Sequence, residues 1–334
     1  MRCSGGSAMT SAATLQRHDG AGEGGRGPFA RYVSAVSPFT PVLGLVRSAI
    51  AAAALLTLVF TPTDQLFFRS SAFPTGANCG NSMSWMSLFC IGSSSGHLEL
   101  TKWVAVSVLA IVVTGLLPAI TALPHWWVTW SLMSSSTAVD GGEHLAANLT
   151  LILVPLVLLD RRRWHWTPDR RYVSRSSWVA VIGYTTLGLW TLQMMGVYFQ
   201  ASVAKFSVLE WSDGTALWYW MQNPVFAPAG AVGDLVRNAL QWLPLTVIAT
   251  YGTLALQLAL VGAVFMPRRP RHLLLGLAVA FHLAIAVLMG LWSFSIIMIA
   301  ADLLLLLRPH ESESVARAVH MGSRNERQVN HASA

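Results

Sequence analysis

The stretch VYFQASVAKFSVLEWSDGTALWYWMQNPVF, residues 197–226, decides how the rest of the chain is interpreted. It follows a nearly uncharged run, residues 176–196, that is long enough to cross a bilayer. It contains Lys205, one of the two lysines in the chain, and then a group of tryptophan and tyrosine residues typical of a membrane–water boundary. Lys205 is therefore expected at the edge of a membrane helix.

The overall composition also indicates a membrane protein. Of the 334 residues, 54% are hydrophobic and 11% are charged, and the mean hydropathy is +0.51. Soluble proteins have about a quarter charged residues. We therefore expect an all-α, polytopic transmembrane helical bundle whose partner is the lipid bilayer. The net charge of +7 does not indicate nucleic-acid binding, because the basic residues are spread over short loops.

The apolar runs predict about eight spans with both termini in the cytoplasm. They are residues 41–60, 102–117, 121–138, 143–159, 176–205, 240–266, and two short helices within 272–307 that break near residues 290–292. Most arginines then lie inside, as the positive-inside rule requires, and Arg47 is expected to reach the inner surface. Residues 38–308 form the membrane domain, flanked by disordered cytoplasmic tails, 1–37 and 309–334.

This topology places a set of polar side chains on one outer face. They are Asp140, Glu143, His144, Lys205, Glu210 and Asp213. Carboxylates, an imidazole and an amine together suit acid–base catalysis, and we expect the acidic residues to face Lys205. Two structural explanations stay open, because Lys205 can anchor its helix at the interface and Asp140 or Glu143 can cap the helix that follows.

Two ionisable residues fall inside predicted spans, His282 and Asp302. An aspartate in the membrane interior is costly without a partner, so we expect Asp302 to contact His282 or a buried backbone donor. The pair suggests either a proton path or a polar contact between helices, and the second is the commoner arrangement.

The cysteines and histidines predict a disulfide rather than a metal site. Cys79 and Cys90 share one loop, and a disulfide between them is predicted if that loop lies outside the cytoplasm. The histidines have no metal-ligand spacing, so no metal site is predicted. The sequence also lacks the motifs of serine hydrolases, P-loop ATPases and dinucleotide-binding enzymes.

Within the opening stretch, a group of residues resembles the HTTM domain that is shared with the vitamin K-dependent gamma-carboxylase. The residues of this motif are Tyr198, Phe199, Ala201, Lys205, Trp211, Asp213, Gly214 and Ala216. Two other stretches, residues 39–60 and 139–166, resemble the sporulation-delaying protein B (SdpB) family of bacterial antimicrobial-peptide systems. Together the three resemblances cover residues 38–308.

The resemblance implies a multi-pass protein of the bacterial plasma membrane. It implies action beside a small SdpA-like protein in the maturation or export of a secreted antimicrobial peptide, or bacteriocin, from its precursor. In the carboxylase the matching lysine is the base that deprotonates the reduced vitamin, so the resemblance implies Lys205 as a catalytic base. A reduced quinone as cofactor is implied by resemblance alone.

Three functions therefore stay open. The first is a maturation or export factor for a secreted peptide. The second is a carboxylase-like or quinone-dependent membrane enzyme that uses Lys205 as its base. The third is a transporter or an immunity protein that binds the peptide without changing it.

Overall fold

The computed structural model describes residues 36–71, 73–80, 83–137, 141–167 and 177–311. These parts of the chain are helices joined by turns, and among them the only β-type pairing is an isolated bridge between Leu116 and Trp164. The helical class predicted from the composition is confirmed.

The long helices occupy the predicted apolar runs. They are α2 (Pro41–Phe60), α5 (Leu98–Thr114), α6 (Pro118–Ser135), α7 (Gly141–Leu158), α8 (Ser177–Phe206), α12 (Leu243–Gly262), α13 (Arg268–Met289) and α14 (Trp292–Leu306). The short ones are α3 (Thr63–Leu66), η1 (Ser84–Met86), α4 (Leu88–Ser94), α9 (Leu209–Ser212), α10 (Ala216–Trp220), α11 (Gly230–Leu240) and η3 (Ala263–Phe265).

Four of the described helices are long and apolar enough to cross a membrane: α2, α7, α12 with η3, and α13. Helix α14 is apolar but only 15 residues long. Helices α5, α6 and α8 do not combine the length and the apolar composition of a membrane span, so the count of eight spans stays a prediction.

Glycine and proline explain why the helix boundaries differ from the predicted ones. Helix α5 ends at Thr114, because the next residue, Gly115, has φ of +79°, the left-handed conformation that stops a helix. Pro118 does not end that helix but begins α6, where its missing N–H costs no hydrogen bond. Gly290, with φ of +72°, separates α13 from α14 at the predicted break.

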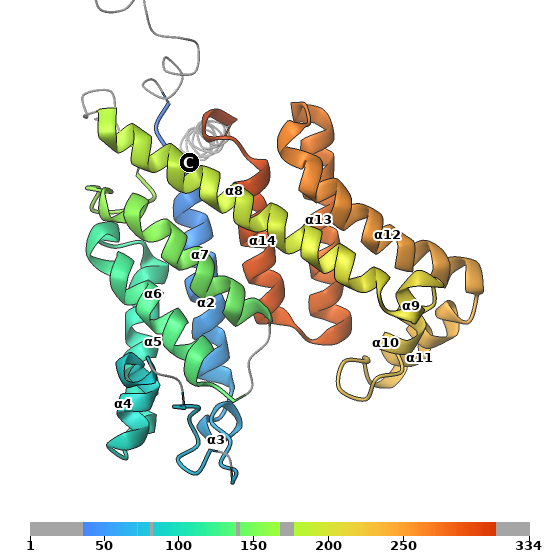
Figure 1. Cartoon of the computed structure of the whole chain (residues 1–334), viewed down its shortest axis with the longest axis horizontal. Helices are drawn as coiled ribbons and strands as arrows, with labels where there is room; N and C mark the ends of the chain where they lie inside the picture. Colours follow the sequence, from blue (N-terminus) through green and yellow to red (C-terminus); the bar gives the residue numbers. More distant parts are fainter. Residues whose placement is uncertain (1–35, 72, 81–82, 138–140, 168–176, 312–334) are drawn as a thin grey trace, which may run out of the picture.

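Helix α2 is the centre of the first half of the molecule. It packs against α5, α7 and the last helix, α14, so the two ends of the described chain meet (Figure 1). Thr40 caps its start, because the hydroxyl accepts a 3.2 Å hydrogen bond from the amide of Leu43. Two hydrophobic cores share this helix, one with α7, α8 and α14, and one with α5, α6 and the loop before α4.

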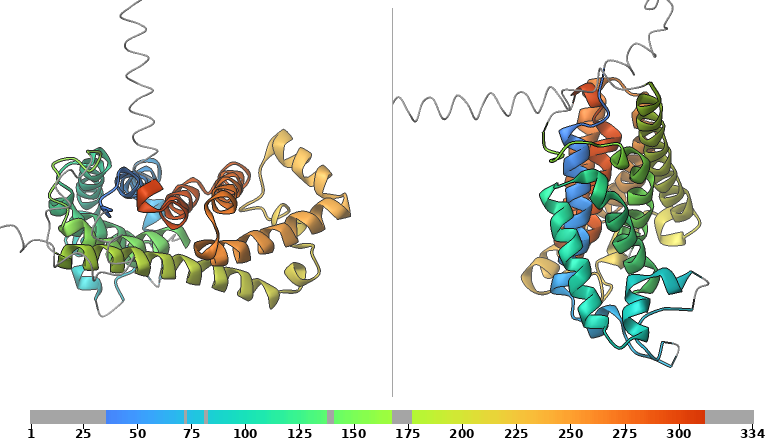
Figure 2. Two further views of the ribbon diagram at one scale, coloured as in Figure 1. Left: turned by 90° about the horizontal axis from the view of Figure 1, so that it is seen from above. Right: turned by 90° about the vertical axis from the view of Figure 1, so that its left-hand side faces the viewer.

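Helix α8 connects this bundle to a more open second half. Figure 2 shows it running along one face of the row of upright helices, and Figure 1 shows it crossing them diagonally. Its C-terminal part packs on α12, and the short helices α9, α10 and α11 fold back around that end. Lys205 therefore lies at the junction of the long helix and the short ones.

Candidate functional site

One face of α8 carries a polar side chain on each of its last turns. Tyr198, Ser202 and Lys205 are spaced i, i+4 and i+7 and therefore share one side of the helix. Tyr198 and Ser202 are buried, and Lys205 is half-buried. This side faces α12, α13 and α14, so the three polar residues lie inside the second half of the molecule.

The deep end of this face is a buried group of three side chains, which we call the inner cluster: Tyr198, His282 and Asp302. The Tyr198 hydroxyl donates a 2.6 Å hydrogen bond to Asp302 Oδ1 and lies 3.2 Å from His282 Nε2. His282 Nε2 lies 3.5 Å from Asp302 Oδ2. Each of these residues is at most 1% exposed. The tyrosine hydroxyl stabilises a carboxylate that would otherwise be costly in this apolar interior.

The outer end of the face is the amine site, formed by Lys205, Gln257 and Trp211. Lys205 Nζ donates 2.8 Å and 3.3 Å hydrogen bonds to the carbonyl oxygen of Ala201 and to Gln257 Oε1. It also lies 5.2 Å from the centre of the Trp211 ring, a favourable distance for a cation over an aromatic face. These partners are neutral, so they hold the amine without an ion pair.

The expectation that acidic side chains face Lys205 stays a prediction, and the contacts of the described residues do not support it. No carboxylate there makes an ion pair or hydrogen bond with its amine. Asp213 instead closes the turn before α10, accepting from the Thr215 amide and hydroxyl at 3.0 and 2.6 Å. Glycine suits this turn because Gly214 has φ of +86°.

The other predicted acid–base residues are at the start of α7 or just before it. Glu143 is buried in the first turn of α7, and His144 is exposed beside it. Asp140 lies outside the described residues. The helix-capping explanation for Glu143 therefore stays open, and its part in chemistry at Lys205 is not supported by a contact.

The remaining motif residues surround the amine site in different ways. The ring of Phe199 points outward and is 54% exposed, whereas Ala216 is buried beside Trp211 and Leu254. Tyr251 of α12 donates a 2.8 Å hydrogen bond to the carbonyl oxygen of Ser212 and lies against Gly214. These contacts fix α9 and the turn after it over the end of α8.

The inner cluster and the amine site are neighbours without a continuous side-chain connection. The Ser202 hydroxyl lies between them, but it donates to the Tyr198 carbonyl oxygen at 2.9 Å and approaches Gln257 Oε1 only at 3.5 Å. A proton path along α8 is therefore not supported by these hydrogen bonds. The geometry instead favours an amine that acts at the rim, above a buried cluster that locks α8 to α13 and α14.

Three cavities open around α10, next to the amine site. Leu217 and Met221 line an apolar groove of about 490 Å³ between α12 and α13. Trp218 and Tyr219 line a second cavity of about 260 Å³. Tyr219 and Trp220 line a third of about 270 Å³, which also includes Trp211. The aromatic run in the sequence therefore forms cavity walls as well as interfacial surface.

Sequence reasoning missed Ser202 and Gln257. Both carry a detectable signal, because Gln257 is a lone amide in the apolar helix α12, and Ser202 lies one turn from Tyr198. The link between Tyr198 and Asp302 joins residues 104 positions apart, and no local pattern predicts it.

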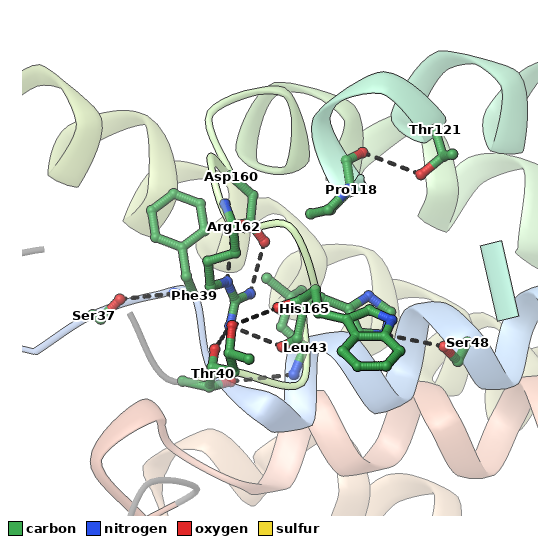
Figure 3. A network of polar contacts seen from close by, with 12 residues as sticks. Ser37, Phe39, Thr40, Leu43, Ser48, Pro118, Thr121, Asp160, Arg162 and His165 are labelled. Carbon is green, nitrogen blue, oxygen red and sulfur yellow. Dashed lines mark hydrogen bonds and ion pairs between the residues drawn. The ribbon is translucent and has the colours of Figure 1, made fainter. Parts of the chain in front are cut away.

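A second polar network lies at the other end of the bundle and has a structural role (Figure 3). Arg162 donates to Asp160 at 2.8 and 2.7 Å and to the carbonyl oxygens of His165 and Thr167. Both charged side chains of the pair are at most 5% exposed. His165 Nε2 lies 3.2 Å from the Ser48 hydroxyl of α2. The network holds the loop after α7 against α2.

This network corrects the interpretation of two arginines. Arg162 is buried in the loop, although the sequence suggested a solvated inner-surface charge. Arg47 does not reach the surface either, because it is 2% exposed and its Nη2 donates a 2.7 Å hydrogen bond to Thr121 of α6. The pattern of charges in the sequence does not distinguish an arginine exposed on a loop from a buried arginine whose side chain connects two parts of the fold.

The loop between α2 and α5 contains the predicted disulfide, Cys79–Cys90. The bridge joins the middle of the loop to α4, and Phe89 beside it packs on Phe67 with ring centres 4.9 Å apart. Among the described residues, no group of three or more potential metal-ligating side chains forms.

Comparison with known proteins supports part of the resemblance. YitO of Bacillus subtilis (strain 168), described as uncharacterized, is 37% identical over 277 residues, which cover 83% of this chain and 88% of YitO. The chain belongs to the YitO family. Sporulation-delaying protein SdpB of the same strain is 29% identical over 279 residues, 83% of this chain and 84% of SdpB.

The similarity to SdpB and the four apolar helices are consistent with an SdpB-like membrane protein. No family model matches the chain, and no solved structure matches it. The HTTM resemblance therefore stays a prediction.

Proposed function

We propose that the chain is a multi-pass protein of the bacterial plasma membrane that acts in the maturation or export of a secreted antimicrobial peptide. The observation that carries this proposal is the similarity to SdpB over 84% of that protein, combined with four apolar helices of membrane-spanning length. A small SdpA-like protein and a peptide precursor are the partners we propose with it.

The proposed arrangement has eight spans, cytoplasmic termini and a membrane domain from residue 38 to 308. The C-terminal end of α8, the loop with Cys79–Cys90 and the turn between α13 and α14 point toward the same end of the molecule (Figure 1). The proposal places this end outside the cytoplasm, where a disulfide persists. The buried Arg162 network then lies at the cytoplasmic end.

Within this role, the amine site is the candidate for chemistry. A lysine held by neutral hydrogen-bond acceptors, beside open cavities, can bind an anionic or carbonyl group or accept a proton after losing its own. The HTTM resemblance makes a carboxylase-like reaction, with a reduced quinone as cofactor, the second candidate function. Transport or immunity without covalent change is the third.

Deletion of the gene tests the proposed function. Secreted peptide should fall below one tenth of the parental amount, or its mass should change, in a strain that retains the precursor and the small partner. Unchanged amount and mass of the secreted peptide would contradict the role.

Two substitutions at Lys205 separate the candidates. Lys205→Met removes the amine, whereas Lys205→Arg keeps a cation over Trp211 but cannot lose its proton at neutral pH. If Lys205 is a base, both variants lose the product while their membrane abundance stays normal. If the lysine binds by charge, only Lys205→Met loses the product. Full product with both variants would remove Lys205 from the mechanism.

A further inference from the structure

The third cavity beside α10 combines a carboxylate with aromatic walls. Its lining includes Glu210, Trp211, Tyr219, Trp220 and Asn223, and its volume is about 270 Å³. The volume is enough for one long side chain or a short peptide segment, and too small for a folded partner. We call it the acidic aromatic cavity.

Among the described residues, Glu210 is the only carboxylate that lines this cavity, and its oxygens make no hydrogen bond or ion pair with any of the others. The residue is half-buried. Asp213, three positions away, differs because the Thr215 turn occupies its carboxylate. Partial burial of the Glu210 carboxylate without a partner is unfavourable. A bound cation would supply that partner, so the cavity favours a cationic ligand.

The aromatic side chains favour the same ligand. The faces of tryptophan and tyrosine rings attract ammonium and guanidinium groups, with Trp the strongest of these side chains. Trp211 already has the Lys205 ammonium 5.2 Å from its ring centre, so Tyr219 and Trp220 are the rings left for a second cation. Tyr219 is 57% exposed and Trp220 37% exposed, so both rings are accessible from the cavity mouth.

The cavity also shares a wall with the amine site, because Trp211 belongs to both. A group bound against this wall therefore lies next to Lys205. The apolar groove begins on the other side of α10, at Leu217 and Met221. An extended peptide with one basic side chain and neighbouring apolar side chains matches this order of surfaces.

From these contacts we infer that the acidic aromatic cavity binds a cationic side chain, lysine or arginine, of the peptide on which this protein acts. The inference rests on the proposed function, and it deepens that function by assigning Glu210 as a residue that positions the peptide beside Lys205. Glu210 supplies the charge, and Trp211, Tyr219 and Trp220 supply the aromatic walls.

A binding experiment with the full-length protein in lipid nanodiscs tests the inference. The probes are the capped peptide Gly-Ser-Lys-Ser-Gly and the same peptide with its lysine Nε-acetylated, followed by ligand-observed NMR. Wild-type protein should bind the lysine peptide about tenfold more tightly than the acetylated one. Glu210→Gln should weaken this preference, because only the aromatic walls then favour the cation. The matched control, Asp234→Asn, changes an exposed carboxylate of α11 outside the cavity and should keep it.

Equal binding of the two peptides to wild-type protein would overturn the inference, and so would an unchanged preference in Glu210→Gln. Secretion assays separate this failure from failure of the proposed function. If deletion abolishes secreted peptide but Glu210→Gln secretes it at the parental level, the proposed function stands and the inference fails. If deletion itself has no effect, the proposed function fails, and the binding data alone decide whether the cavity selects cations.

Discussion

The two halves of the molecule differ in how much of each helix is covered by protein. In the first half, 61% of the apolar window of α2 and 56% of that of α7 are buried. In the second half, the corresponding values are 33% for α12 and 22% for α13. The first half is therefore a packed scaffold, whereas the second half leaves helix faces available to lipid, substrate or partner.

Some polar side chains show a related difference, although the second half also has buried contacts of its own, the Arg271–Glu311 ion pair and the inner cluster. In the first half, the charges of Asp160 and Arg162 are paired and sealed, and Arg162 uses further donors on backbone carbonyls. In the second half, Lys205 has only neutral partners and Glu210 faces a cavity. Buried polar side chains whose hydrogen bonds are all made within the protein indicate a structural role. Polar side chains that face a cavity remain able to bind a ligand.

The largest effect is expected when the sealed network of the first half is broken. Arg162→Ala leaves the buried Asp160 carboxylate without its partner, which should lower the free energy of unfolding by about 3–5 kcal/mol. Thermal unfolding of the detergent-purified protein, followed by chromatographic recovery of the folded form, measures the change.

The matched control for this prediction is Arg237→Ala, because Arg237 pairs with Asp234 at the surface. An exposed pair contributes less than about 1 kcal/mol, so this variant should unfold near the wild-type temperature. A similar loss in both variants would mean that the Asp160–Arg162 network is not the stronger anchor.

A smaller loss is expected from the inner cluster of the second half. Tyr198→Phe removes the hydroxyl that donates to Asp302 Oδ1 and leaves a buried oxygen without that donor, at a cost of about 2 kcal/mol. The same unfolding assay applies, with Tyr219→Phe as the control because Tyr219 is 57% exposed. If Tyr198→Phe is as stable as the control, the inner cluster does not lock α8 to α14.

A pH effect should appear in the first half. Burial, followed by the charges of Arg47 and Arg162, lowers the pKa of the His165 ring to about 4, although the charge of Asp160 opposes this. An unfolded histidine has a pKa near 6.5, so between about pH 6.5 and 4 the unfolded chain binds the additional proton. Stability from this residue is therefore complete above about pH 6.5 and falls as the pH drops to about 4.

The expected size of this loss is up to about 2 kcal/mol. Unfolding temperatures of wild-type protein and His165→Gln, compared from pH 7.5 to 4.5, measure it. The wild-type curve should fall more steeply, while other titrating groups, such as Glu311, contribute equally to both. Parallel curves would show that His165 is solvated and that the loop after α7 is not sealed.

The sequence predicted the helices better than the contacts between them. The fourth apolar run, residues 143–159, became α7, Gly141–Leu158, because a polar turn and an arginine-rich loop bound it. The break after α13 was predicted because residues 272–307 are long enough for two short helices, and Gly290, with φ of +72°, makes that break. Lys205 was identified as unusual because lysine is rare near a membrane helix, but its partner Gln257 comes from another helix 52 positions away.

Other features could not be predicted because they depend on three-dimensional packing. Arg47 and Arg162 have the same charge as the surface arginines near them, and only the positions of Thr121 and Asp160 show that they are buried. The expected group of acids around Lys205 depends on packing in the same way, and the printed partners of its amine are the Ala201 carbonyl oxygen and Gln257.

The central claim is that Lys205 presents an accessible amine at the outer end of the open half. The two lysines of the chain allow a direct test in intact cells, by labelling with a membrane-impermeant amine reagent and peptide mass spectrometry. Lys102 is the internal control, because it is 5% exposed and donates to the carbonyl oxygen of Thr61. We predict at least about tenfold more labelling of Lys205 than of Lys102. Equal labelling, or labelling of Lys205 only after the membrane is broken, would contradict the account.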